Sequence, residues 1–311
     1  MRIDFVIPVF NERDSLERLV AGITEHVGPH LHRIVLVDDG STDGSFEVIC
    51  RLREAYDTVD AIRFRRNFGK SAALAAGFGH ADGDVVFTMD ADLQDDPKEI
   101  PRFLEKIEEG FDVVSGWKRV RHDPWHKTMP SQVFNGGIAR IFGLDLHDVN
   151  CGFKAYRREV VKAIRVYGER HRLLPVLAQE RGYRIGEIEV EHHARAFGRS
   201  KYGFERFARG AMDVLSVWFL RRYRHSPGHF FAGIGMASAS LGVLALLIAA
   251  VLALAGHPLK AGALMAAGMI AGVGGWVSVG LGLLAELVVE RAPFDVAMCI
   301  AEEHVGASER E

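Results

Sequence analysis

Two long stretches without a charged residue constrain the fold of this chain more than any other feature. Residues 229–256 and 261–285 contain no Asp, Glu, Lys or Arg. Each stretch is about 25 residues long, and about 20 residues of helix cross the hydrocarbon core of a bilayer. We therefore predict two membrane-spanning helices, at about 229–255 and 261–286. Only the short segment 256–260 separates them, so the two helices should form a hairpin with both flanks on one side of the membrane.

Basic residues beside the first stretch indicate which side that is. The cluster "RRYRH" (221–225) lies directly before it, and basic residues are enriched on the cytoplasmic side of membrane proteins. The N-terminal "MRIDFVIPVF" has one basic residue and an apolar run too short for a signal peptide. We expect a multi-pass protein of the cytoplasmic (inner) membrane whose large N-terminal part, residues 1–200, lies in the cytosol.

The segments flanking the predicted hairpin (229–289) are also interpretable. Residues 201–228 show helical apolar spacing with interleaved basic residues, which predicts an amphipathic helix on the membrane surface or a core helix of the soluble domain. We expect the acidic C-terminal tail, 290–311, to be solvated in the cytosol. Gly, Ala and Ser in the hairpin suit close packing, either within it or between the subunits of a homo-oligomer. Glu286 is predicted to snorkel to the cytosolic interface, with a lipid-handling role as the alternative.

Charge and cysteine content exclude some classes of protein. The net charge of −3 argues against a nucleic-acid partner, because such proteins present a basic surface. The three cysteines, Cys50, Cys151 and Cys299, are far apart and odd in number. They fit neither a disulfide framework nor a Cys-x-x-Cys metal site, and we expect ordinary buried thiols.

The N-terminal part alternates apolar β-branched runs with helical patterns. Strands are predicted at 3–9, 33–39, 61–64, 84–90 and 111–116, and helices at 15–27, 44–56, 70–81 and 97–110. Strict alternation of strand and helix indicates an α/β fold with a mostly parallel sheet covered on both faces. Such sheets bind ligands beyond the carboxyl ends of their strands, where the strand order switches.

The stretch "FTMDADLQDDP" (87–97) lies at such a strand end. In an extended segment residues two apart project to one side, so Asp90, Asp92 and Gln94 could converge on one hard cation. Oxygen ligands of this kind suit Mg²⁺ or Mn²⁺. A D-x-D sequence is also common in solvated surface loops, so its position after a buried strand is what favours function.

A second acidic pair, Asp38 and Asp39, ends the second predicted strand. These carboxylates could accept hydrogen bonds from a base and a ribose, while Ser41, Thr42 and Asp43 could cap the following helix. A Rossmann cofactor site is the obvious rival for this fold, but the first turn reads "PVFNERDS" without its glycine fingerprint. We reject that alternative.

Six motifs in order resemble those of family 2 glycosyltransferases of GT-A fold: "PVFNE" (8–12), "VDDGSTDGS" (37–45), "RNFGKSAALAAGF" (66–78), "DADLQDDP" (90–97), "VNCGFKAYRR" (149–158) and "RAFGRSKYG" (195–203). The chain is most similar to the branch of dolichol-phosphate mannosyltransferases and bacterial polyprenyl-phosphate glucosyltransferases. The likeness covers essentially the whole chain, including the membrane hairpin. The Q-x-x-R-W motif of processive synthases is absent.

The resemblance implies roles for individual residues. The nucleotide sugar would be bound by Pro8, Asn11, Glu12, Asp38, Asp39, Lys70 and Asp90, and Asp92 and Gln94 would hold Mg²⁺ or Mn²⁺. The phosphates of acceptor and donor would be bound by Lys127, Ser131, Arg195, Ser200 and Lys201. Asp90, Asp92, Arg195 and Lys201 would be the catalytic set. Lys127 stands where the mannosyltransferase pattern commonly has Arg, which leaves its role open. The basic loop 117–127 could equally be a solvated charged face.

The implied reaction is an inverting, metal-dependent transfer of a hexose from a nucleotide sugar to a polyprenyl phosphate. An ionised lipid phosphate needs no strong base to become a nucleophile, so the reaction requires mainly alignment and charge stabilisation. UDP-glucose is favoured as donor, with GDP-mannose as the alternative. A membrane glycosyltransferase with another glycolipid acceptor and a non-catalytic scaffold remain as rival interpretations.

Overall fold

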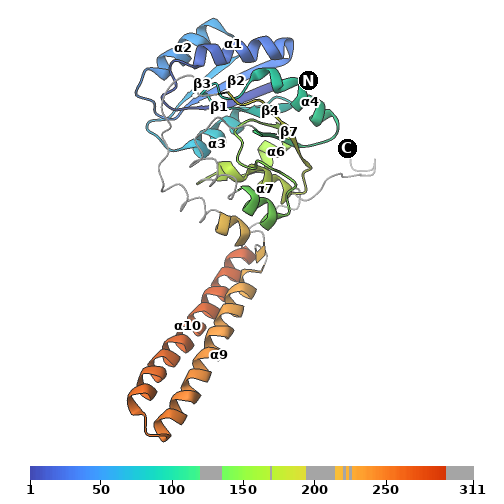
Figure 1. Cartoon of the computed structure of the whole chain (residues 1–311). Coiled ribbons are helices and arrows are strands. Elements are labelled where there is room, and N and C mark those ends of the chain that lie inside the picture. The colour runs from blue at the N-terminus through green and yellow to red at the C-terminus, as the bar shows by residue number, and fades with distance from the viewer. Residues whose placement is uncertain (120–134, 169, 194–213, 220–221, 224–225, 292–311) are drawn as a thin grey trace, which may run out of the picture. The chain divides into compact units, whose positions relative to one another are not determined.

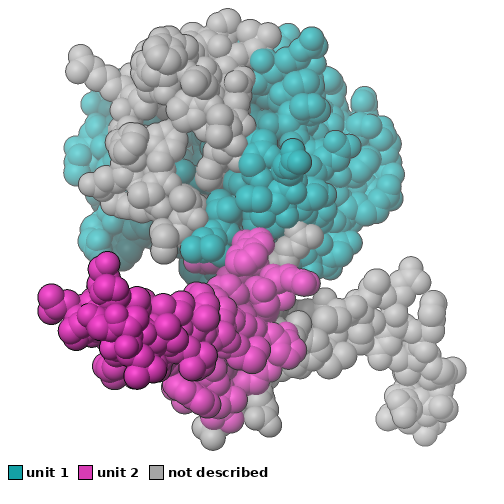
Figure 2. Space-filling view, turned by 60° about the horizontal axis from the view of Figure 1, so that its bottom comes forward, with its two compact units in different colours: residues 1–215 teal, residues 216–311 magenta. Residues whose placement is uncertain are grey.

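A computed structural model describes residues 1–119, 135–168, 170–193, 214–219, 222–223 and 226–291 of the 311-residue chain. The chain divides into two compact units, residues 1–215 and 216–311, which Figure 2 colours separately. The predictions for residues 120–134 and 194–213, which include the first part (201–213) of the predicted amphipathic helix, concern residues outside those described.

The first unit is an α/β domain in which strands and helices alternate along the chain. Its strands are β1 Ile3–Val9, β2 Leu31–Asp38, β3 Val59–Arg63, β4 Val85–Thr88, β5 Val113–Trp117, β6 Lys154–Arg157 and β7 Ile185–Glu189. Its helices are α1 Leu16–Val27, α2 Ser45–Ala55, α3 Lys70–His80, α4 Ile100–Glu108, α6 Arg158–Ala163 and α7 Leu174–Gln179. Short 3-10 turns occur at η1 Gly28–His30, η2 Pro97–Glu99 and η3 Arg170–Leu173.

The strands pair into one sheet of order β3-β2-β1-β4-β6-β5-β7. Among the described strands β6 alone is antiparallel to its neighbours, β4 and β5, and the rest run parallel. The predicted α/β class with a mostly parallel sheet is therefore confirmed. Because the chain moves from β1 to β2 on one side and returns to β4 on the other, the switch of strand order lies between β1 and β4.

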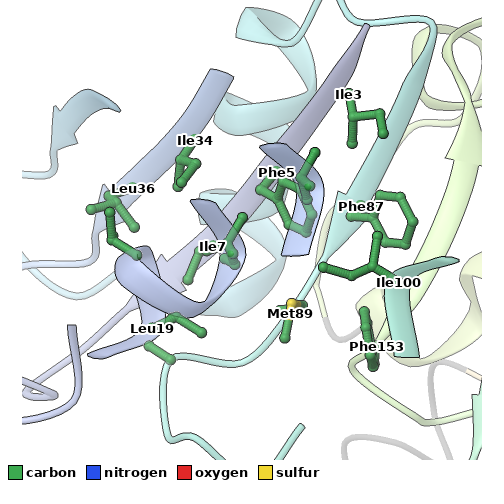
Figure 3. Close-up of a cluster of buried hydrophobic side chains, with 14 of the residues drawn as sticks. Ile3, Phe5, Ile7, Leu19, Ile34, Leu36, Phe87, Met89, Ile100 and Phe153 are labelled. Carbon is green, nitrogen blue, oxygen red and sulfur yellow. The ribbon is translucent and has the colours of Figure 1, made fainter. Parts of the chain in front are cut away.

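Helices cover both faces of this sheet, with α1, α2 and α4 on one face and α3, α6 and α7 on the other (Figure 1). Phe5, Ile7 and Phe87 point from the strands into the core beneath α1 and α4 (Figure 3). Phe5 and Phe87 stack at 5.0 Å between ring centroids, which ties β1 to β4. On the other face, a Cβ at Gly77 would lie 2.2 Å from Val6 Cγ1, so glycine lets α3 pack directly on β1.

The second unit contains an antiparallel pair of long helices, α9 Pro227–Leu254 and α10 Pro258–Arg291. Both are long and apolar enough to cross a membrane. Leu241, Val251 and Ile270 are among the many large apolar side chains that these helices leave exposed. Exposure of so many apolar side chains to water would be unfavourable, so these surfaces agree with contact with the lipid of a bilayer.

A seam of small residues at intervals of seven joins the two helices. The buried positions are Gly235, Gly242 and Ala249 of α9 and Ala261, Gly268, Gly275 and Gly282 of α10. A Cβ at Gly242 would lie 2.7 Å from the Gly268 carbonyl oxygen, so only glycine permits this approach. Ser238 Oγ adds a hydrogen bond of 2.8 Å to the Ala271 carbonyl. A seven-residue period is the repeat of helix pairs with coiled-coil packing. These small residues therefore serve packing within the hairpin.

Glu286 has a contact that the sequence did not suggest. Its Oε2 accepts a hydrogen bond of 2.9 Å from the backbone N–H of Gly228, in the first turn of α9. Backbone N–H groups there have no partner within the helix, and the helix dipole favours a negative charge. Glu286 thus caps α9 from α10 and fastens the open end of the hairpin.

Candidate active site

Polar loops from four parallel strands gather at the carboxyl edge of the sheet. The loops follow β1, β2, β4 and β5, and they begin near Phe10, Asp39, Met89 and Lys118. The loops after β1 and β4 flank the switch point, where sheets of this kind bind their ligands. The predicted site residues at 8–12 and 90–94 therefore belong to the loops that flank the switch point.

The loops after β1 and β2 are fastened to each other. The backbone N–H of Asn11 donates to Ser41 Oγ at 2.9 Å, and Thr42 N–H donates to Asn11 Oδ1 at 2.8 Å. Asn11 has a φ of 52°, a conformation that asparagine tolerates better than most residues. Glu12 N–H donates to Ser45 Oγ at 3.0 Å. The motif beginning at Pro8 thus receives its shape from the motif that follows β2.

The capping role predicted for the second motif is only partly correct. Asp43 Oδ1 accepts from the N–H of Ser45, the first residue of α2, at 3.0 Å. Ser41 and Thr42, in contrast, bond to Asn11 rather than to the helix.

Asp38 and Asp39 are both buried, and they have different hydrogen-bond partners. Asp38 Oδ1 accepts from Ser41 N–H at 3.2 Å, while its Oδ2 is buried without a hydrogen bond from the described residues. Asp39 accepts from the N–H groups of Phe68 and Gly69 at 2.7 and 2.9 Å. Burial raises the pKa of Asp39 even though these bonds oppose the shift. Asp39 therefore anchors the loop that leads into α3, and a contact of either residue with a nucleoside remains a prediction.

Asp90 and Lys70 form an ion pair at the centre of the site. Lys70 begins α3, and its Nζ bonds to Asp90 Oδ1, with exposed side-chain fractions of 22% and 36%. Burial works to raise the pKa of Asp90, but the ammonium groups of Lys70 and Lys118 outweigh it and hold that pKa at about 2. Asp90 is thus ionised at neutral pH.

The D-x-D segment is a turn, and the extended geometry predicted for it is wrong. Ala91 and Asp92 form the turn, and Leu93 has a φ of 59°, which is rare and strained for a leucine. Asp92 is buried and accepts from Gln94 N–H at 3.2 Å. The Gln94 amide nitrogen donates to the His193 carbonyl at 3.3 Å. Strain of this kind is typical of functional sites, where the surrounding structure maintains it.

Lys118 supports this turn from β5. Its Nζ lies 2.6 Å from Asp95 Oδ1, with side-chain exposures of 12% and 0%. Burial works to lower the pKa of Lys118, and the Asp95 carboxylate outweighs it, so the pKa lies above its usual range. For Lys118 the solvated-face interpretation of the loop 117–127 is therefore wrong. A buried charge pair is stable only when both partners are present, so Lys118 and Asp95 hold the D-x-D turn and β5 together.

The "NCGFK" motif closes the other side of Asp90. A Cβ at Gly152 would lie 2.5 Å from Asp90 Oδ2, so the glycine makes room for the carboxylate. Lys154 is fully buried and bonds through Nζ to the Cys151 carbonyl, and burial lowers its pKa. Burial raises the pKa of the Cys151 thiol to about 12, so Cys151 is the inert thiol expected. Cys50 is half-buried, and Cys299 lies outside the described residues.

The sequence missed three residues of this site: Lys118, Gly152 and Lys154. Each lay inside a segment already noted for its motif or charge, yet nothing local indicated its contact. The predicted phosphate ligands Lys127, Ser131, Arg195, Ser200 and Lys201 all lie outside the described residues. Their placement stays a prediction.

A second cluster of potential metal ligands lies near this site. Asp96, Glu191 and His193 bring three ligand atoms within 4.8 Å of one another. However, Lys98 Nζ lies 2.6 Å from Glu191 and 3.2 Å from Asp96, and so neutralises them. Asp90 is likewise paired with a lysine, Lys70, and Asp90 and Asp92 differ from this cluster in lying at the switch point, with oxygen donors of the kind that Mg²⁺ and Mn²⁺ prefer.

Known proteins share this sequence pattern and this architecture. The family described as glycosyl transferase family 2 matches residues 4–165. A dodecaprenyl-phosphate galacturonate synthase of Rhizobium johnstonii is 40% identical over 258 residues, which are 80% of this chain and 75% of that protein. An undecaprenyl-phosphate 4-deoxy-4-formamido-L-arabinose transferase of Edwardsiella ictaluri is 40% identical over 221 residues, 69% of this chain and 67% of its own length.

Solved structures agree on the fold. Glucosyl-3-phosphoglycerate synthase from Mycobacterium tuberculosis, in complex with Mn²⁺, UDP and phosphoglyceric acid, matches with a TM-score of 0.55 at 18% identity. The match covers 71% of this chain and 78% of that one. The same enzyme with Mg²⁺ and UDP gives a TM-score of 0.54 over 71% of this chain and 79% of that chain. At this identity the likeness establishes the GT-A architecture and no more.

Proposed function

The chain belongs to glycosyl transferase family 2, and from that membership we propose that it transfers a single sugar from a nucleotide sugar to a polyprenyl phosphate. It is a glycosyltransferase, and both curated relatives are named as transferases or synthases acting on polyprenyl phosphates. The product would be a polyprenyl-phosphate sugar, and the nucleoside diphosphate would be released.

The observation that carries this proposal is the group of charged side chains at the switch point, where Asp92 and Asp95 are buried and Lys70 and Asp90 are partly exposed. Asp90 lies between Lys70 and Gly152, while Asp92 lies in a strained turn that Lys118 and Asp95 brace. A catalytic site for phosphate chemistry needs preorganised charges in this way, because their reorganisation during the reaction would be costly. A non-catalytic scaffold would have no need to maintain the strain at Leu93.

We propose that Asp92, with Asp90 and Gln94, binds Mg²⁺ or Mn²⁺. The fit rests on two carboxylates at one turn, the low pKa of Asp90 and the preference of these ions for oxygen. The amide oxygen of Gln94 is the third candidate donor. When bound, such an ion neutralises charge that develops on the leaving diphosphate.

The residues of the chain would then divide the work of one displacement. A lipid phosphate oxygen forms the new bond to the anomeric carbon as the bond to the donor's diphosphate oxygen breaks, with inversion at that carbon. Lys70, already fixed beside Asp90, supplies positive charge next to the leaving group. The lipid phosphate is already ionised, so no side chain has to remove a proton from it. Lys127, Ser131, Arg195, Ser200 and Lys201 remain our candidates for the acceptor phosphate.

The sugar is the least determined part of the proposal. The sequence favoured UDP-glucose, whereas the relatives are named for galacturonate and 4-deoxy-4-formamido-L-arabinose. We therefore propose a UDP-linked sugar, and place UDP-galacturonate and the UDP-linked formamido pentose beside UDP-glucose as donors.

We further propose that the hairpin α9–α10 anchors the enzyme in the cytoplasmic membrane with the first unit in the cytosol. An aromatic cluster supports the anchoring of the hairpin: Trp218, Tyr223 and Phe230 lie with ring centroids 5.0–6.4 Å apart at the start of α9. Trp and Tyr are enriched where helices leave the bilayer.

The test is transfer of radiolabelled sugar from a panel of nucleotide sugars to undecaprenyl phosphate by purified full-length protein. The panel contains UDP-glucose, UDP-galacturonate, the UDP-linked formamido pentose and GDP-mannose. We expect label in the lipid phase with one donor, dependent on Mg²⁺ or Mn²⁺ and lost in Asp92→Ala. Transfer to a glycolipid but not to polyprenyl phosphate would contradict the proposed acceptor, and no transfer with folded protein would favour the scaffold interpretation.

A further inference from the structure

The 3-10 turn η3, Arg170–Leu173, packs against the first turn of α3, a hundred residues earlier in the chain. The backbone and the ring of His171 both contact the hydroxyl oxygen of Ser71 there. The backbone N–H of His171 donates to Ser71 Oγ at 3.1 Å, and the ring Nδ1 of His171 lies 2.9 Å from that oxygen. Ser71 is buried, with 2% exposure. The proposed function assigns no role to either residue.

Ser71 follows Lys70, and the position of Lys70 needs external support. Lys70 is the first residue of α3, and the positive end of a helix dipole disfavours an ammonium group there. Gly69, the N-cap, provides no side chain to cap the helix. Asp39 holds the backbone of Gly69 from one side, and His171 holds Ser71 from the other. Hydrogen bonds thus hold the residue before Lys70 and the residue after it.

The charge state of His171 fits this arrangement. Burial, and then the nearby charges of Lys70 and Arg172, lower the pKa of His171 well below 6.5, so the ring is neutral at physiological pH. A neutral ring adds no further positive charge beside Lys70. With its hydrogen on Nε2, the ring accepts from the Ser71 hydroxyl while the His171 backbone donates to the same oxygen.

We infer that His171 is a positioning residue that acts through Ser71 to hold Lys70 against Asp90. The inference rests on the proposed function, because Lys70 and Asp90 form the donor half of the proposed site. His171 would set the geometry of the charge beside the leaving diphosphate without contacting it. Misplacement of such a charge by about 1 Å can cost on the order of 100-fold in rate.

Kinetics of four variants test the inference: His171→Leu, His171→Asn, Lys70→Met and the double variant of His171→Leu with Lys70→Met. His171→Leu should lower kcat/KM for the nucleotide sugar roughly 10- to 100-fold. His171→Asn should recover most of that loss, since its amide oxygen can accept from Ser71 where Nδ1 did. The double variant should be no slower than Lys70→Met, because residues that act as a unit are not additive.

Leu173→Ala is the matched control for packing. Leu173 is a buried residue of η3 whose side chain makes no hydrogen bond to Ser71. Its truncation should lower the melting temperature at least as much as His171→Leu while leaving kcat/KM within about threefold of wild type. Equal losses of kcat/KM in the two variants, or additive losses in the double variant, would overturn the inference.

A second measurement does not depend on transfer. Labelling of lysines with an amine-reactive ester, quantified by mass spectrometry, reports whether Lys70 stays in its ion pair. Reactivity of Lys70 relative to Lys98 should rise severalfold in His171→Leu and stay at the wild-type value in Leu173→Ala. Unchanged reactivity in His171→Leu refutes the positioning role even if the wild type transfers no sugar. A wild type that transfers no sugar, with the expected labelling, refutes the proposed function alone.

Discussion

Substitution of Gly152 by alanine tests whether the Asp90 carboxylate must lie where the structure has it. The new Cβ would lie 2.5 Å from Asp90 Oδ2, 2.9 Å from its Cγ and 3.1 Å from Oδ1. Ordinary van der Waals contact begins at 3.4 Å, so the carboxylate has to move by about 0.9 Å. Because Lys70 bonds to Oδ1, this movement would also disturb the ion pair.

A displacement of that size predicts a loss of about 100-fold in kcat/KM, or ~2.7 kcal/mol in activation free energy. The assay is initial-rate transfer from the best nucleotide sugar to undecaprenyl phosphate, with a melting curve to confirm that Gly152→Ala is folded. Gly79→Ala is the control, because a Cβ there meets nothing within 4 Å. A helical Gly→Ala change should leave activity unchanged and raise stability by about 0.5–1 kcal/mol. Full activity of folded Gly152→Ala would refute the assigned position of Asp90.

Three further predictions follow from charge and packing. The folded-state pKa of Asp90, about 2 against an ordinary 3.8, means that its pairing with Lys70 stabilises the fold fully above about pH 4 and ceases as pH falls towards 2. The stability cost of Lys70→Met, measured by melting temperature, should therefore shrink over that range, and a constant cost would contradict the pairing. Cys151, with its pKa at about 12, should resist iodoacetamide at pH 8 in native protein and react once the chain is unfolded; rapid native labelling would show an open site. Gly242→Leu should destabilise the hairpin by about 1–3 kcal/mol in detergent, because its side chain would clash with α10. Gly274→Leu should not, because a Cβ there meets nothing within 4 Å. Equal effects of the two substitutions would contradict close packing of the helices at Gly242.

The elements were predictable where local pattern and tertiary structure agree. The segments 3–9 and 84–90 were predicted as strands, and β1 and β4 lie within them. A strand without an apolar run was not predictable: β6, Lys154–Arg157, reads KAYR and lies inside a segment noted solely as a motif, whereas β4, of the same length, reads VVFT. Its antiparallel direction arises because the chain inserts it between β4 and β5, which no local pattern encodes.

The site was predictable as a set of loops and less so as a set of contacts. Asp90 and Asp92 could be located because acidic residues at a strand end are unusual. Their geometry could not, because Leu93 adopts a conformation that leucine ordinarily avoids. Similarly, Lys118 looked like part of a solvated loop until β5 placed it against Asp95, and two residues 23 positions apart give no sign of pairing in a sequence.

The membrane hairpin was likewise predictable as an element, while its internal contacts were not. Its existence followed from the absence of charge, which a bilayer requires. The prediction that Glu286 lies at the interface stays a prediction, and its hydrogen bond to the backbone of Gly228 could not be predicted from the sequence. An apolar sequence specifies that helices span a membrane, and the register between them decides which groups meet.

The nucleotide released during transfer tests the central claim most directly. Purified full-length protein would be incubated with the preferred UDP-sugar, undecaprenyl phosphate and Mg²⁺ or Mn²⁺, and both products would be quantified by mass spectrometry. The proposed displacement at the anomeric carbon predicts one equivalent of UDP for each lipid monophosphate sugar formed, with both products lost in Asp92→Ala. Release of UMP with a lipid diphosphate sugar, or undiminished turnover in Asp92→Ala, would contradict the mechanism assigned to this site.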